Sequence, residues 1–335
     1  MYSDYKVLDV HAHVSAPDAA YVIIAQMLGA NTPIPSPLRF GGHLRLPAED
    51  YEAAAARHVA YIDERSIDVQ ILGPRPYLML GWMEPHLLPA WCEYVNDLIH
   101  QQCALFPRRF LGACQLPQLS DAPDTSNCIR ELDRCVNELG FVAAYVSPDP
   151  GGRRTTPGMH DPYWFPLYER CQALDVPIII HGTNSLDPRY RVVPQNYQIA
   201  FVTEQYGAVQ CLSHGDVFDR YPELRIVSCH CGGALNRFIP SDHHLAQRDL
   251  SNNLFFDTCA YDHTFLAAAI KQRGVAQTCF GVEAPGSGRT INPETGKTCD
   301  DLVPVISALD WLTDEDKRKI FHDNPAKVCP ALAKV

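Results

Sequence analysis

Two histidines stand two positions apart near the start of the chain, in the segment His11-Ala12-His13. They close a short apolar run that begins at residue 7. If that run is a strand, side chains two positions apart point to the same side, so both imidazoles can reach one ion. A pair of this kind also arises often by chance. It therefore indicates a metal site only if further ligands converge on it.

Three later apolar runs also end in a residue of this chemical type, namely His181, His230 and Glu283. Each has a simpler interpretation when taken alone: a histidine satisfied in the core, a capping residue, or a carboxylate in a salt bridge. Together with the first pair, such placement by independent chance is improbable. Three neutral imidazoles and a carboxylate suit Zn²⁺ and tolerate Mn²⁺ or Co²⁺. We therefore predict one divalent metal ion, with room for a water molecule.

These residues need a fold that brings distant runs together. Short apolar runs alternate with segments of helical periodicity, such as residues 125–139, which Gly140 is placed to end. This alternation implies parallel strands, and eight such units close a (β/α)8 TIM barrel. The predicted strands are residues 7–11, 69–73, 110–115, 142–147, 177–181, 225–230, 254–257 and 278–283.

A barrel explains why the candidate ligands belong together, because its active site lies at the C-terminal ends of the strands. The long connections at residues 16–50 and 183–196 follow the first and fifth strands, so we interpret them as loops inserted over that face. The fourth run, residues 141–147, contains no lysine. A carboxylated lysine that bridges two metals is thus unavailable there, and a single ion follows. No linker or repeat divides the chain, which predicts one domain over residues 1–335.

Composition narrows the class of protein. A hydrophobic fraction of 46% with 20% charged residues is typical of a globular chain, and the net charge of −11 argues against nucleic acid or an anionic membrane as a partner. No apolar run approaches a membrane span of about 20 residues, and the N-terminus lacks the layout of a secretory signal. The 13 cysteines are scattered without a CxxC pair, which indicates free thiols. We expect a cytoplasmic enzyme, compatible with a homo-oligomer.

Several motifs, taken together, resemble one family. The His-Ala-His pair, residues 215–227 and the sequence His230-Cys-Gly-Gly233 resemble the decarboxylase and hydratase branch of the amidohydrolase superfamily. The resemblance runs from the first strand to residues 324–328, essentially the whole chain. Within the branch, residues 255–259 and 283–293 are similar to the 4-oxalomesaconate hydratases and the zinc-dependent meta-cleavage product hydrolases.

The resemblance implies a role for each matching residue. His11, His13 and His181 would be metal ligands, Glu283 the carboxylate near or on the metal, and His230 the acid–base residue. Four residues fall where the hydratases hold substrate carboxylates: Arg75, Asn196, Arg237 and Arg289.

Two departures from the family pattern bear on the reaction. The decarboxylases of the branch carry Asp where this chain has Glu283, which counts against simple decarboxylation. The run after His181 and the first motif also differ from those of the hydratases. Our first interpretation is hydrolysis of a carbon–carbon bond in a carboxylated keto or enol acid, a ring-fission product of an aromatic compound.

Other interpretations stay open. They are hydration of a carbon–carbon double bond in an oxo-acid, decarboxylation, and a catalytically silent metal-binding scaffold. Asp257, at the end of the seventh run, likewise has two interpretations. It orients a histidine ligand, or it caps the strand.

Overall fold

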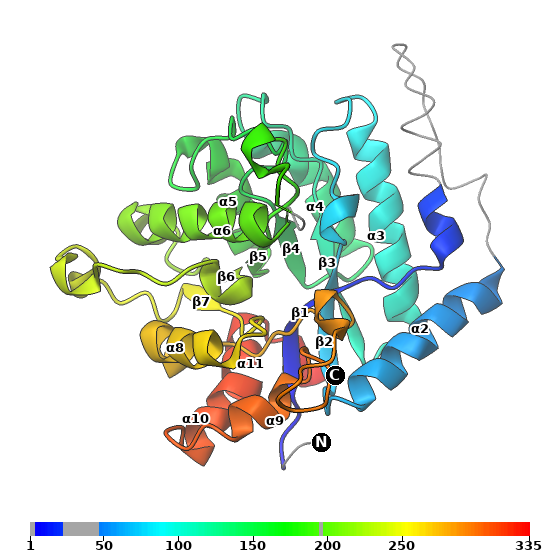
Figure 1. Ribbon diagram of the computed structural model, residues 1–335. Helices are drawn as coiled ribbons and strands as arrows, with labels where there is room; N and C mark the ends of the chain where they lie inside the picture. The colour runs from blue at the N-terminus through cyan, green and yellow to red at the C-terminus, as the bar shows by residue number, and fades with distance from the viewer. Residues whose placement is uncertain (1–3, 23–46, 194–196) are drawn as a thin grey trace.

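The computed structural model describes residues 4–22, 47–193 and 197–335 (Figure 1). Seven parallel strands form one sheet in which each strand pairs with its neighbours in chain order. All seven begin within one residue of the predicted starts. The strands are β1 (Leu8–His13), β2 (Val69–Gly73), β3 (Phe110–Gln115), β4 (Ala143–Val146), β5 (Ile178–Ile180), β6 (Ile226–Ser228) and β7 (Leu254–Phe256).

The eighth predicted strand, residues 278–283, is not formed as a regular strand. Its amide at Cys279 donates to Phe256 of β7, while Val10 of β1 donates to Phe280 at 3.0 Å. The segment thus lies between the two outer strands and bonds to both. Its ladder is broken because the Phe280 amide turns to Ile320 instead, at 2.8 Å. The structure therefore shows a seven-stranded parallel sheet, not the predicted regular barrel of eight.

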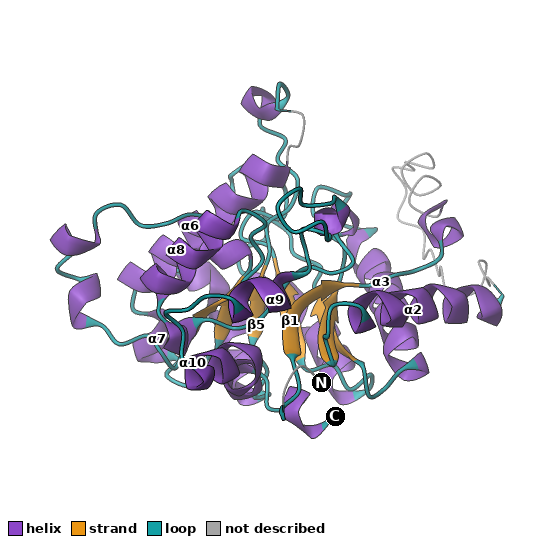
Figure 2. Ribbon diagram, turned by 60° about the horizontal axis from the view of Figure 1, so that its bottom comes forward, coloured by secondary structure: helices purple, strands orange, loops and turns teal. Residues whose placement is uncertain are grey.

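Helices cover the outside of the sheet, as Figures 1 and 2 show. The predicted helix at residues 125–139 is present as a 3-10 turn followed by an α-helix, and Gly140 follows with φ of 71°. The α-helices are α2 (Ala48–Asp63), α3 (Leu88–Leu105), α4 (Ile129–Asn137), α5 (Phe165–Ala173), α6 (Tyr197–His214), α7 (Val217–Arg220), α8 (His263–Arg273), α9 (Leu302–Ser307), α10 (Asp314–Arg318) and α11 (Asn324–Val328).

Two hydrophobic clusters hold these layers together. The larger packs the helices on the sheet, and the smaller takes one face of every strand, with Val10, Tyr145 and Phe255 among its members. Both faces of the strands are therefore buried, as parallel strands require. Leu332 and its neighbours near the C-terminus join the smaller cluster. Figure 2 shows the C-terminus near the end of the sheet at which β1 begins.

Other sequence-based expectations have mixed outcomes. All 13 cysteines are free, as predicted, and ten of them are buried. Among the described residues, no helix is both long and apolar enough to cross a membrane. Most of the loop expected over the site, residues 23–46, and Asn196 lie outside the described residues.

Candidate metal centre and active site

Four imidazoles meet at the C-terminal end of the strands, and we call them the histidine cluster: His11, His13, His181 and His230. The ring centroid of His181 lies 5.0 Å from that of His11, 5.2 Å from that of His13 and 4.9 Å from that of His230. The first three side chains are fully buried. The two histidines of β1 meet at an interplanar angle of 89°. A bulge between Asp9 and Ala12 interrupts the regular alternation of β1 there.

The Nδ1 atoms of three of these histidines face acceptors. His13 Nδ1 lies 2.8 Å from Pro74 O, and His181 Nδ1 lies 2.6 Å from Gly182 O. Because these oxygens can only accept, Nδ1 carries the proton and Nε2 keeps its lone pair. The Nε2 atoms of His11 and His181 are buried without a hydrogen-bond partner in the described part of the chain. Such orphaned nitrogens, with the other ring nitrogen anchored, are what a metal ion requires.

Glu283 completes the donor set. Its Oε1 lies 3.2 Å from His13 Nε2, and its Oε2 lies 3.6 Å from His230 Nε2. One ligand atom each from His11, His181, His230 and Glu283 lie within 4.8 Å of one another. The structure thus brings together all five residues that the sequence predicted as metal-binding or catalytic.

The pKa values of these histidines and of Glu283 are shifted in different directions. Burial lowers the pKa of His13 to about 4 and that of His181 well below its usual value, which favours the neutral form of both rings. Burial alone would raise the pKa of Glu283, but His13 and His230 hold it well below the usual range. Burial would likewise lower the pKa of His230, but its bond to Glu283 raises it. His230 is thus better suited to carry a proton than His13 or His181.

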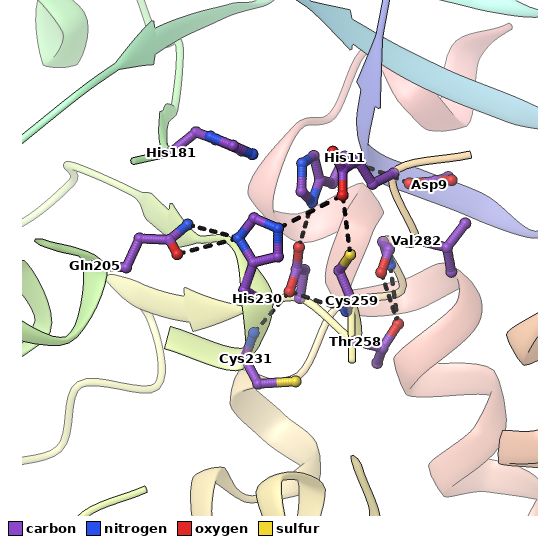
Figure 3. A network of polar contacts seen from close by, with 12 residues as sticks. Asp9, His11, His181, Gln205, His230, Cys231, Thr258, Cys259 and Val282 are labelled. Carbon is purple, nitrogen blue, oxygen red and sulfur yellow. Dashed lines mark hydrogen bonds and ion pairs between the residues drawn. The ribbon is translucent and has the colours of Figure 1, made fainter. Parts of the chain in front are cut away.

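Asp257 makes contacts that fit both of its predicted roles, with His11, Cys231 and Cys259, three residues that Figure 3 labels. Its Oδ2 lies 2.6 Å from His11 Nδ1 and fixes that ring. Its Oδ1 accepts hydrogen bonds from the backbone amides of Cys231, at 2.9 Å, and Cys259, at 3.1 Å. One carboxylate therefore orients a candidate ligand and holds the backbone that follows His230.

Two cavities flank this centre. One, of about 610 Å³, is lined by His230, Cys259, Tyr261 and Ser287 among others. The other, of about 660 Å³, holds three arginines and, among its described lining residues, no carboxylate; we call it the arginine cavity. Its arginines are Arg57, Arg75 and Arg289.

A family profile described as amidohydrolase matches residues 8–330. The chain belongs to the amidohydrolase family. It is 36% identical over 294 residues, 84% of both chains, to a 2-keto-4-carboxy-3-hexenedioate hydratase from a Sphingobium species. It is also 32% identical to a gamma-resorcylate decarboxylase from a Polaromonas species, over 53% of this chain and 56% of the relative.

Solved structures agree with this membership. A 4-oxalomesaconate hydratase from Rhodopseudomonas palustris superimposes with a TM-score of 0.84 and 30% identity, covering 97% of this chain and 96% of that one. A dihydroxybenzoic acid decarboxylase from Polaromonas, solved with bound manganese, shares the fold with a TM-score of 0.66 and 22% identity, covering 97% and 96%. Amidohydrolases bind a divalent metal ion, and the group formed by His11, His181, His230 and Glu283 could hold one.

Of the residues predicted to bind substrate carboxylates in this amidohydrolase, two line a cavity and one does not. Arg75 and Arg289 lie in the arginine cavity, and Arg75 Nε donates to Val14 O at 3.0 Å. Arg237 lies on an exposed segment, with its guanidinium 5.9 Å from the ring centroid of Phe238, and it lines neither of the two cavities.

Three residues at the site were missed by sequence reasoning. Arg57 lines the arginine cavity, Gln205 Oε1 lies 3.1 Å from His230 Nδ1, and Ser287 Oγ donates to Glu283 Oε2 at 3.0 Å. Arg57 and Gln205 lie within helices and belong to no motif. Only Ser287, inside the stretch that resembles the hydratases, carried a signal that could have found it.

Proposed function

We propose that this amidohydrolase is a metal-dependent hydratase that adds water to a carbon–carbon double bond of a carboxylated oxo-acid. The observation that carries the proposal is its 36% identity, over 84% of both chains, to a hydratase of 2-keto-4-carboxy-3-hexenedioate. The similarity to the structure of a 4-oxalomesaconate hydratase supports the same reaction. These relatives favour hydration over carbon–carbon bond hydrolysis, which was our first interpretation.

The donor set supports one Zn²⁺, with Mn²⁺ or Co²⁺ as substitutes, because imidazole and carboxylate suit these ions. The ligands would be His11, His13, His181 and Glu283. When bound, such an ion lowers the pKa of coordinated water and polarises a substrate oxygen. His11 is held for this role by Asp257, and His13 by the carbonyl of Pro74.

His230 is proposed to move the proton. Its Nε2 faces Glu283, and its Nδ1 faces the Gln205 side chain, so the ring is fixed at both nitrogens. It also lines the cavity of about 610 Å³, where a substrate carbon can approach it. Glu283 stabilises the protonated ring; for its part in turnover two alternatives stay open, holding the metal ion or exchanging a proton with His230.

The arginine cavity supports a substrate with several carboxylates. Arg75 and Arg289, joined by Arg57, place three guanidinium groups in one cavity, although the chain as a whole carries a net charge of −11. Guanidinium groups bind carboxylates with two parallel hydrogen bonds and so fix their orientation. Asn196 and Arg237 remain predictions for the same task.

Decarboxylation is the second candidate, since decarboxylases are also among the relatives. A direct test separates the reactions. Purified protein is incubated with 4-oxalomesaconate, with 2,6-dihydroxybenzoate and with an aryl-substituted ring-fission product, and the products are analysed by mass. We expect the first to gain one water and the others to stay intact. Loss of CO₂ or release of two fragments, without hydration, would refute the proposal.

The proposal also includes the fold, a barrel closed by an eighth strand. The hydrogen bonds of residues 278–283 to both β7 and β1 support an irregular eighth strand that closes the barrel. We also propose that residues 1–335 act as one domain.

A further inference from the structure

The backbone that follows β6 is unusual. Four consecutive residues have a positive φ: His230 at 52°, Cys231 at 57°, Gly232 at 79° and Gly233 at 82°. Two of them are not glycine, and residues with a Cβ adopt this left-handed conformation only at a cost in free energy. We call residues 230–233 the left-handed turn. Because His230 is part of it, the turn determines where the imidazole points.

The turn is tightly enclosed. A Cβ on Gly233 would lie 2.1 Å from Val202 O of α6, and one on Gly232 would lie 2.8 Å from the Phe256 ring of β7. Both glycines are therefore required by space as well as by conformation. Enclosure alone does not hold a strained backbone, however, and its polar groups need partners.

Arg273, the last residue of α8, supplies partners for two carbonyls of this region. Its Nε donates to Cys231 O at 3.3 Å and its Nη2 donates to Ala234 O at 2.6 Å. Its guanidinium carbon lies 4.2 Å from the ring centroid of Phe256. Within the described ranges, no carboxylate forms an ion pair with Arg273. Its hydrogen bonds are thus made with the backbone that follows His230.

Both backbone polar groups of Cys231 have side-chain partners. The Cys231 amide donates to Asp257, which also fixes His11, and the Cys231 carbonyl accepts from Arg273. The metal ligand His11 and the left-handed turn therefore share one support, Asp257. Arg273 is the second support, and among the described residues it forms no hydrogen bond with a member of the histidine cluster.

We propose that Arg273 is a positioning residue, which holds the left-handed turn and thereby sets the orientation of the His230 imidazole. Its role in turnover rests on the proposed function, in which His230 moves a proton. Removing the guanidinium relaxes the turn, so the His230 ring moves away from Glu283 while the proposed metal ligands stay in place.

The neighbouring residue offers a matched control. Gln272 bonds to the backbone of Asn236 in both directions, accepting from its amide at 2.7 Å and donating to its carbonyl at 2.9 Å. Gln272 thus also anchors the segment after β6 to α8, but at Asn236, which follows the left-handed turn. Gln272→Met removes an anchor of similar size without freeing residues 230–233.

The test compares Arg273→Met with Gln272→Met by steady-state kinetics on metal-loaded protein. For Arg273→Met we expect kcat to fall by at least about 10-fold, with KM within about threefold and the metal retained, since a small misplacement of a reacting group costs this much. Gln272→Met should keep kcat within about twofold. An equal loss in both variants would overturn the specific role of Arg273.

A second readout does not depend on activity. The ¹H–¹⁵N signals of the His230 ring, assigned by their disappearance in His230→Ala, should shift in Arg273→Met and stay in place in Gln272→Met. Unshifted signals in folded Arg273→Met would overturn the inference. Shifted signals with unchanged kcat would support the positioning role and instead refute His230 as the proton carrier. If Arg273→Met does not fold, Arg273→Lys keeps one donor and is subject to the same criteria.

Discussion

His58 and the histidine cluster are both buried, but the ring nitrogens of His58 have different hydrogen-bond partners from those of the cluster. His58 is 2% exposed, and its Nε2 lies 2.9 Å from Gln70 Oε1 while its Nδ1 lies 2.9 Å from Gln102 Nε2. Both nitrogens are therefore satisfied by amides. In His11 and His181, by contrast, one nitrogen is anchored and Nε2 has no partner among the described residues.

The comparison shows what distinguishes a candidate ligand from a core histidine. Burial is common to both groups and carries no information about metal. A fully satisfied ring offers no lone pair, whereas an orphaned Nε2 in a buried site costs free energy unless an ion binds it. The predictions below test this distinction.

The largest effect is expected for His11→Ala. Removing one ligand should reduce the metal content from one ion per chain to near zero and lower kcat/KM by at least about 10³-fold, since the ion supplies several kcal/mol to the reaction. Elemental analysis and kinetics measure both. The matched control is His58→Gln, which should retain one ion per chain. Metal loss in both variants would break the distinction between the two groups.

The second effect separates a proton carrier from a ligand within the histidine cluster. His230→Ala should keep the metal and lose kcat by at least about 10²-fold, the usual scale of acid–base catalysis. Metal content is measured beside turnover on the same preparation. If the metal is lost as in His11→Ala, His230 is a ligand and the proton must be carried by another residue.

A smaller effect concerns the arginine cavity. Arg75→Ala should raise KM for a polycarboxylate substrate by about 10-fold or more, because each hydrogen-bonded charge pair is worth roughly 1.5–3 kcal/mol. Arg108→Ala, an exposed arginine before the start of β3, serves as the control and should leave KM unchanged. An unchanged KM in Arg75→Ala would exclude this cavity as the carboxylate site.

The smallest effect concerns stability alone. The pKa of His58 is lowered to about 3, chiefly because the ring is buried. The positive charges of Arg75 and Arg289 lower it further. The stability contributed by the neutral ring is present above the unfolded-state pKa of about 6.5 and is lost as the pH falls toward the folded value. Below about pH 6, the free energy of unfolding should therefore decline more steeply for the native protein than for His58→Gln, by up to about 1.4 kcal/mol per pH unit.

Denaturant unfolding between neutral pH and about pH 4.5 measures this difference. Parallel curves for both proteins would show that His58 takes up a proton in the folded state. It would then resemble His230, whose pKa is raised, more closely than His13, whose pKa is lowered.

The sequence by itself predicted which five residues meet at the candidate metal centre. Apolar runs predict strands locally, and parallel strands end at the same edge, so His11, His13, His181, His230 and Glu283 could be brought together without knowledge of any contact. The starts of seven strands were predicted within one residue for the same reason.

Only the tertiary structure showed which partners surround these residues. The contact between Asp257 and His11 joins residues 246 positions apart in the sequence. Gln205 and Arg57 reach the site, and Arg273 reaches the turn beside it, from helices that carry no motif. The irregular segment at residues 278–283 likewise follows from competing hydrogen bonds, such as that of Phe280 with Ile320. Strand formation follows from local patterns, whereas the satisfaction of a ring nitrogen or the grouping of charges depends on partners that folding brings from elsewhere.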